Sequence, residues 1–208
     1  MFASNKQHSF RARLAVGTAL ATMALSYGGR PAYAGTCTGA AGVYSCTGAA
    51  NVLTDSTNGG VGDIISPNAP LTITTTSGFG LDTSTNGGRG FITVGQGTIF
   101  TDNYASAITG AERGMFIINN VTGSMAVTTT GQVTGNAGEG IFARNDSGTA
   151  HMTVSAASVS GTTRGIYALS GGSGIMTVTS TGTVTASAGN GIFAVDQQAG
   201  TDINITAN

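Results

Sequence analysis

The sequence predicts an all-β fold, a parallel β-helix in which coils of about 25 residues stack along one axis. A short motif recurs as Gly140-Ile141-Phe142-Ala143, Gly165-Ile166-Tyr167-Ala168 and Gly191-Ile192-Phe193-Ala194, with weaker copies at Gly90 and Gly114. Between the copies, apolar and small polar residues alternate, which is typical of strands and not of helices. Only 8% of residues are charged, Gly numbers 34 and Pro 3, which favours short strands and tight turns over a disordered or collagen-like chain.

Residues 1–34 have the features of a secretory signal peptide. A basic start with Lys6, Arg11 and Arg13 precedes an apolar run from Leu14 to Leu25, and Ala32-Tyr33-Ala34 supplies the small-x-small pattern of a cleavage site. As a helix this run spans about 18 Å, which is short of the roughly 30 Å of a membrane interior. We therefore expect the segment to direct export and to be removed. The alternative is a buried amphipathic helix.

Removal of residues 1–34 makes the chain acidic. Four of the eight basic residues precede the cleavage site, whereas all nine acidic residues follow it, and this leaves a formal charge of −5. Nucleic acids and anionic lipids bind basic surfaces, so the composition argues against both as partners. No later stretch is long and apolar enough to predict a transmembrane helix in the mature chain.

Residues 35–70 are expected to form an N-terminal loop and an irregular first coil. Cys37 and Cys46 lie close together in the sequence, and in an exported chain their default state is a disulfide that closes a short loop. Neither a zinc site nor a redox C-x-x-C pair is indicated, because further ligands and that spacing are both missing. Turn-forming Gly, Asn and Pro residues follow as far as Pro70.

Residues 71–208 are expected to form the β-helix proper. Each repeat contains two short strands and the Gly-Ile-x-Ala strand, and such a unit buries a face only by stacking on its neighbours. The recurring glycine is expected at a corner that requires positive φ or leaves no room for a Cβ atom. The position before this glycine is occupied by Arg113, Glu139 and Arg164 in successive repeats. We therefore expect Glu139 to lie between the two arginines and to form exposed ion pairs with them. Three inward columns are expected: Ile141, Ile166 and Ile192; Ala143, Ala168 and Ala194; and Val127, Val154 and Val178.

No constellation of residues predicts catalysis, a cofactor or a metal site. Gly138-x-Gly140-x-x-Ala143 matches a dinucleotide-binding pattern, but a strand is predicted where the pattern requires a helix. Gly171 to Met176 resembles a calcium-binding nonapeptide, with methionine at the ligand position. Glu112 and Glu139 come nearest to the paired carboxylates of a hydrolase, but beside arginines we interpret them as exposed turn residues. His151 has no nucleophile placed by the repeat to face it.

A column of aromatic residues is the candidate ligand face. It occupies the position between the inward Ile and Ala of the motif, so the period of two along a strand points it outward. A row of exposed rings can bind sugars or a partner surface. The alternative is that the row packs under a turn or stabilises the stack. The column consists of Phe116, Phe142, Tyr167 and Phe193.

Three features of the chain occur together: a signal peptide, a short cysteine loop ending Val43-Tyr44-Ser45-Cys46-Thr47-Gly48, and repeated Gly-Ile-x-Ala and T-V-T-x-T-G-x-V-T segments. This combination, which covers nearly all of residues 1–208, is similar to the start of autotransporter passenger domains of Gram-negative bacteria. The resemblance implies a right-handed parallel β-helix displayed at the cell surface, often in adhesion, and it supplies no catalytic residues. Such passengers are followed by a C-terminal outer-membrane barrel that this sequence lacks, so we expect a truncated segment.

The expected function is therefore non-enzymatic, an adhesin-like segment of a displayed passenger. Two alternatives remain open: a carbohydrate-active lyase or hydrolase built on the same fold, and a purely structural spacer. The expected partners are a host or surface glycan or protein and, in a full-length protein, its own translocator barrel. The signal peptide predicts export to the cell surface, the outer membrane or the exterior, or to the periplasm for a fragment alone.

Overall fold

The computed structural model describes residues 36–40, 43–47, 49–50, 63–66, 71–75, 80–82, 91–95, 97–119, 123–146, 150–198 and 202–208. All of them belong to one compact unit, Tyr33–Asn208. The expected signal peptide lies outside the described residues. Within these residues every regular element is a β-strand, and none forms a helix with the length and apolar character that crossing a membrane requires.

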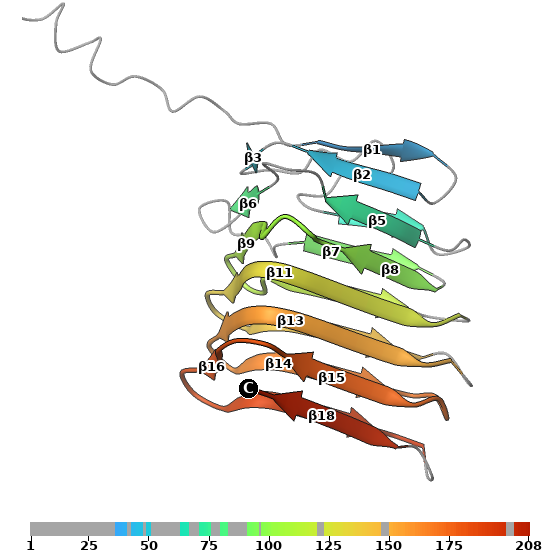
Figure 1. Ribbon diagram of the computed structural model, residues 1–208, viewed down its shortest axis with the longest axis vertical. Helices are drawn as coiled ribbons and strands as arrows, with labels where there is room; N and C mark the ends of the chain where they lie inside the picture. Colours follow the sequence, from blue (N-terminus) through green and yellow to red (C-terminus); the bar gives the residue numbers. More distant parts are fainter. Residues whose placement is uncertain are drawn as a thin grey trace, which may run out of the picture. The chain divides into compact units, whose positions relative to one another are not determined.

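The strands of successive coils pair in parallel and form three columns (Figure 1). The first contains β2 (Val43–Thr47), β5 (Leu71–Thr75), β8 (Thr98–Thr101), the beginnings of β11 (Met125–Gly135) and β13 (Met152–Gly161), β15 (Met176–Ser180) and β18 (Ile203–Ala207). The second contains β3 (Ala49–Ala50), β6 (Gly80–Asp82), β9 (Ala107–Gly110), the ends of β11 and β13, and β16 (Val184–Ala186). Because β11 and β13 run through both columns, these strands form one sheet.

The third column is a separate six-stranded sheet. It contains β4 (Asp63–Ser66), β7 (Phe91–Gly95), β10 (Met115–Asn119), β12 (Glu139–Asn145), β14 (Arg164–Ser170) and β17 (Asn190–Asp196). The Gly-Ile-x-Ala motif lies in this sheet, and its copies pair residue for residue, as in Ile141 with Ile166 and Ile166 with Ile192. The predicted all-β parallel β-helix is therefore confirmed as a β-solenoid. Its right-handed sense remains a prediction.

The regular stack begins earlier in the chain than expected. The strands β2, β3 and β4 pair in parallel with β5, β6 and β7, so the register already holds from Val43 rather than from Leu71. The described strands before Pro70 therefore follow the same three-column plan as the rest.

The core of the solenoid consists of the inward columns that the repeat predicts. Ile141, Ile166, Ala143 and Ala168 are fully buried, and so are Val127, Val154 and Val178. Their counterparts in the last coil, Ile192 and Ala194, are only partly buried and pack against this core. An inward residue is covered by the coils on both sides, which explains why burial is complete within the stack and decreases in its last described coil.

The motif glycine lies at a corner because a side chain there has no room. A Cβ atom on Gly140 would contact the side chain of Val159 and would approach the carbonyl oxygens of Ser160 and Gly165 to 2.7 and 2.9 Å. These atoms belong to the next coil, so β12 passes directly against its neighbour at this point. The backbone of Gly140 is not in the left-handed region, and close approach is thus the reason for glycine at this corner.

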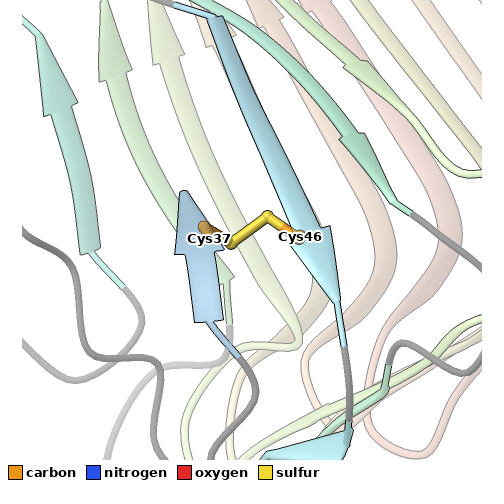
Figure 2. Close-up of a disulfide and its surroundings, with 2 residues drawn as sticks. All are labelled: Cys37 and Cys46. Atoms are coloured by element: carbon orange, nitrogen blue, oxygen red, sulfur yellow. A yellow bond between two sulfur atoms is a disulfide. The ribbon is translucent and has the colours of Figure 1, made fainter. Parts of the chain in front are cut away.

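The strand β1 (Thr36–Ala40) departs from the parallel plan. It pairs antiparallel with β2, with Cys37 opposite Cys46, and the two residues form a disulfide (Figure 2). Both cysteines are buried. The predicted disulfide is therefore present, and it joins two strands at the end of the sheet where the described coils begin (Figure 1).

Candidate functional site

The candidate ligand face lies on the outer surface of the six-stranded sheet. Phe116, Phe142, Tyr167 and Phe193 occupy one position on β10, β12, β14 and β17 and pair in register. Each is partly exposed, whereas within β10, β12 and β14 the residues on either side of it along the strand are buried. The predicted outward direction of the column is confirmed.

The rings of this column contact one another along the stack. Phe116 and Phe142 are stacked with ring centroids 5.0 Å apart, and the planes are 19° from parallel. Phe142 and Tyr167 meet edge to face at 5.2 Å, as do Tyr167 and Phe193 at 5.4 Å. Each such pair contributes about 0.5–1.5 kcal/mol beyond the area that it buries. The four residues therefore form one continuous aromatic row.

Two arginines lie over the aromatic row. The Arg113 guanidinium is 5.2 Å from the Phe116 centroid and 5.4 Å from that of Phe142. The Arg164 guanidinium is 4.4 Å from the Tyr167 centroid and 4.7 Å from that of Phe193. These distances are within the range of cation–π attraction. The surface that the row offers is thus a mixture of aromatic rings and cationic groups.

Glu139 holds both arginines in place. Its Oε2 accepts a hydrogen bond of 2.6 Å from Nε of Arg113, and its Oε1 accepts one of 3.4 Å from Nη1 of Arg164. The order Arg113, Glu139, Arg164 along the stack is the one that the repeat predicts. The expectation that these ion pairs are exposed was wrong, because the side chain of Glu139 is only 9% accessible. A carboxylate between two coils, with a long arginine side chain on each side, is shielded from water.

Glu112 completes this charged cluster. Its Oε1 accepts a hydrogen bond of 2.6 Å from Nη1 of Arg113, and its side chain is 43% accessible. The structure therefore brings Glu112 and Glu139 together, on two different nitrogens of one guanidinium. Glu112 is exposed as expected and Glu139 is not. Two carboxylates that are bound to the same arginine hold that arginine over the rings, and this arrangement orders the aromatic row.

A buried carboxylate that sequence reasoning missed lies elsewhere in the stack. Asp102 follows β8, is fully buried, and has neighbours on the coils before and after it. Its oxygens accept hydrogen bonds from the backbone N–H groups of Tyr104, Ser106, Thr130 and Gly131 and from the hydroxyls of Thr75, Ser106 and Thr130. Asp102 thereby ties three coils together at the bend between β8 and β9.

The hydrogen bonds to Asp102 determine its charge. Burial alone would raise the pKa of this carboxyl group, but the bonds from Ser106, Thr75, Tyr104 and Thr130 outweigh burial and hold the pKa below its ordinary value of 3.8. One sequence signal could have found this residue. Thr75, Asp102 and Thr129 occupy one inward register position on successive coils, and Ala156 occupies the same position on the next coil. An acidic side chain at an inward position requires buried hydrogen-bond donors.

The structure also shows where the other residues considered from the sequence lie. The dinucleotide pattern at residues 138–143 runs from a turn into β12, a strand. The glycine-rich segment at 171–174 connects β14 to β15. His151 is exposed, and its Nδ1 accepts a hydrogen bond of 3.0 Å from the Ile175 N–H. No group of three or more His, Cys, Asp or Glu that could hold a metal ion occurs among the described residues.

A shallow polar hollow of about 260 Å³ runs across three coils at another corner of the stack. Its lining consists of small residues in register on β11, β13 and β16 and in the turns after them, such as Thr134, Ser160 and Thr185. None of the described residues that line it is acidic or basic. Its shape follows from the small residues of this corner, and it is separate from the aromatic row.

No protein-family model, curated protein or solved structure matches the chain. The fold and the geometry described above are therefore the basis for a functional proposal.

Proposed function

We propose that this chain is a non-enzymatic, adhesin-like segment of a surface-displayed passenger, and that the outer face of the six-stranded sheet binds its partner. The single observation that carries the proposal is the row of partly exposed rings with Arg113 and Arg164 over it. Aromatic residues and arginine are the types most enriched at the centres of protein interfaces, where they contribute most of the binding free energy.

The ordering of this face supports a binding role. The rings contact their neighbours and the arginines are held by Glu139, so few side-chain rotamers remain to be immobilised when a partner binds. A preorganised surface loses less conformational entropy on association than a mobile one. The faces of the rings are in part occupied by one another and by guanidinium groups, and this favours a protein surface over the flat stacking of sugar rings.

A carbohydrate-active enzyme remains the alternative of a different class. The approach of Glu112 and Glu139 is the observation in its favour, because glycoside hydrolysis uses paired carboxylates. However, both carboxylates are ion-paired with Arg113, and Glu139 is bound by Arg164 as well. We therefore favour the binding role for this cluster.

Binding by single-residue variants tests the proposal. The chain is applied to a glycan array and to a panel of immobilised extracellular proteins, as wild type and as Phe142→Ala and Tyr167→Ala. Thr128→Ala and Thr179→Ala are the matched controls, because these residues are also partly exposed outward positions but lie on the first column of the other sheet. Thermal unfolding is measured for each variant so that loss of fold is separated from loss of binding.

We expect binding to fall at least tenfold in the two aromatic variants and to be unchanged in the two threonine variants. Equal binding by all variants would remove the aromatic row from the proposal. If the wild type binds neither class of probe, the spacer alternative is favoured. Hydrolysis of an arrayed glycan that Glu139→Gln abolishes would favour the enzyme.

A further inference from the structure

The strand β1 covers an edge that would otherwise be open. Among the described strands, β2 pairs with β5 on one side and with β1 on the other, and β1 pairs with β2 alone. Of the pairs between described strands, β1 with β2 is the antiparallel one, and the others are parallel. An uncovered edge strand presents unpaired N–H and C=O groups that another strand can use. The role of β1 in the sheet is therefore to occupy the edge of β2.

The disulfide fastens this cover. Cys37 and Cys46 are directly opposite in the register, and both are buried. Cys46 shares the inward position of Thr75, and both cysteines belong to the buried core, so the disulfide lies on the core side of the sheet and closes that column. A covalent link between opposite residues prevents the short strand β1 from separating from β2, which a five-residue antiparallel pair alone would not do.

The strand β2 carries none of the charged side chains or prolines that protect natural edge strands. Its residues Val43, Tyr44 and Thr47 favour strand pairing, whereas β1 ends in Gly39 and Ala40, which favour it less. The antiparallel pairing with β1 also shows that the edge of β2 accepts a strand in that direction. The β2 strand of a second copy, related by a twofold axis, would meet it in the same antiparallel direction, and such an interface closes on itself as a dimer.

We propose that the edge of β2 is a self-association surface for a second copy of this chain, and that β1, fastened by the Cys37–Cys46 disulfide, keeps this surface closed. This inference does not depend on the proposed ligand face, which lies on the other sheet.

The test removes the cover in two steps. Cys37→Ser/Cys46→Ser removes the disulfide, and Thr38→Pro/Gly39→Pro is then added. Because N–H groups alternate in direction along a strand, one of two adjacent prolines removes a donor to β2 whichever way β1 faces. Molar mass is measured by light scattering over a range of concentrations, and hydrogen exchange is measured on residues 43–47. If the fourfold variant does not fold, the serine variant is the one compared.

All chains are also made with Ile205→Lys, which places a charge on the exposed edge strand β18 and so isolates the edge of β2. With or without Ile205→Lys, we expect the molar mass of the uncovered chain to rise with concentration to twice that of the covered chain. We also expect the amides of residues 43–47 to be protected from exchange in the dimer. An uncovered chain that stays at the mass of the covered one would overturn the proposal. So would assembly beyond a dimer, or a dimer that Ile205→Lys abolishes.

Discussion

Arg113 and Glu139 are 26 positions apart in the sequence, yet Nε of the first donates a hydrogen bond of 2.6 Å to Oε2 of the second. This contact joins two coils of the solenoid at the outer face of the six-stranded sheet. It also places the guanidinium over the rings of Phe116 and Phe142. The order of the aromatic row therefore depends on an ion pair that is largely shielded from water.

The first prediction concerns the burial of this ion pair. We expect Glu139→Gln to lower the free energy of unfolding by about 1–3 kcal/mol, because it leaves two guanidinium groups without their shared carboxylate. Glu112→Gln is the matched control, since Glu112 also lies 2.6 Å from Arg113 but is 43% accessible. We expect it to cost about 0–1 kcal/mol. Urea unfolding of both variants checks the difference, and equal losses would contradict the role of burial.

The second prediction concerns Asp102. In Asp102→Asn an amide group replaces one carboxylate oxygen and faces the N–H donors that now bond to it, so a buried donor loses its acceptor. We expect the free energy of unfolding at about pH 7 to fall by about 2–4 kcal/mol. Asp146→Asn is the control, because the ion pair of Asp146 with Arg144, at 2.8 Å, is accessible to water, and we expect a cost of less than about 1 kcal/mol.

The third prediction is the pH dependence that Asp102 produces. Its pKa in the folded chain is below the ordinary value of 3.8, so the ionised group stabilises the fold above that value. This contribution is lost as the pH falls from 3.8 through the lower, folded-state pKa. We expect the difference in unfolding free energy between wild type and Asp102→Asn to shrink between about pH 5 and about pH 2. A difference that is constant over this range would contradict a lowered pKa.

The fourth prediction compares two glycines. Gly140→Ala places a methyl group against backbone carbonyls of the next coil, at 2.7 and 2.9 Å, and we expect it to cost about 2–4 kcal/mol. At Gly171 the nearest atoms would be 3.5 Å from a Cβ, so Gly171→Ala should change stability by less than about 1 kcal/mol. Phe142→Ala, on the outer face, should cost less than the bulkier Gly140→Val. Melting temperatures measure all four variants, and equal losses would contradict the close approach.

The fifth prediction concerns the turn after Asp102. Ala105 has a φ of 55°, in the left-handed region that costs an alanine about 1–2 kcal/mol. Glycine avoids this cost, but it gives the unfolded chain more conformational freedom, which lowers the free energy of unfolding by roughly 0.5–1 kcal/mol. We therefore expect Ala105→Gly to stabilise the protein by up to about 1 kcal/mol, measured by urea unfolding. A loss of more than about 1 kcal/mol would show that the backbone there is not strained.

The inward columns could be predicted because the repeat supplies both their members and their direction. Ile141 and Ile166 recur at the same place in the motif, and alternation along a strand points both of them inward. The neighbours of Glu139 followed from the same reasoning, because residues at one repeat position lie one strand apart in the stack. The disulfide followed from the number and spacing of the cysteines.

The role of Asp102 could not be predicted in this way. Its donors come from the turn at 104–106, from Thr75 one coil before it and from Thr130 and Gly131 one coil after it. The repeat relates residues at equal positions in different coils, and of these partners only Thr75 shares the position of Asp102, whereas the others occupy different positions within their coils. The path of each turn brings them together, and turns are the part of this sequence that repeats least.

The sequence by itself determined the period, the strands, the columns that face the core and the partners of Glu139, because each of these is a property of position within a repeat. Only the tertiary structure decided that Glu139 is shielded, that Asp102 is surrounded by donors and that β1 covers the edge of β2. The physical reason is that burial depends on what lies across a turn or at the end of a stack. Most neighbours of Asp102, and the strand β1, come from parts of the chain that do not share the period, and the shielding of Glu139 depends on the paths of the Arg113 and Arg164 side chains, which a repeat position does not specify.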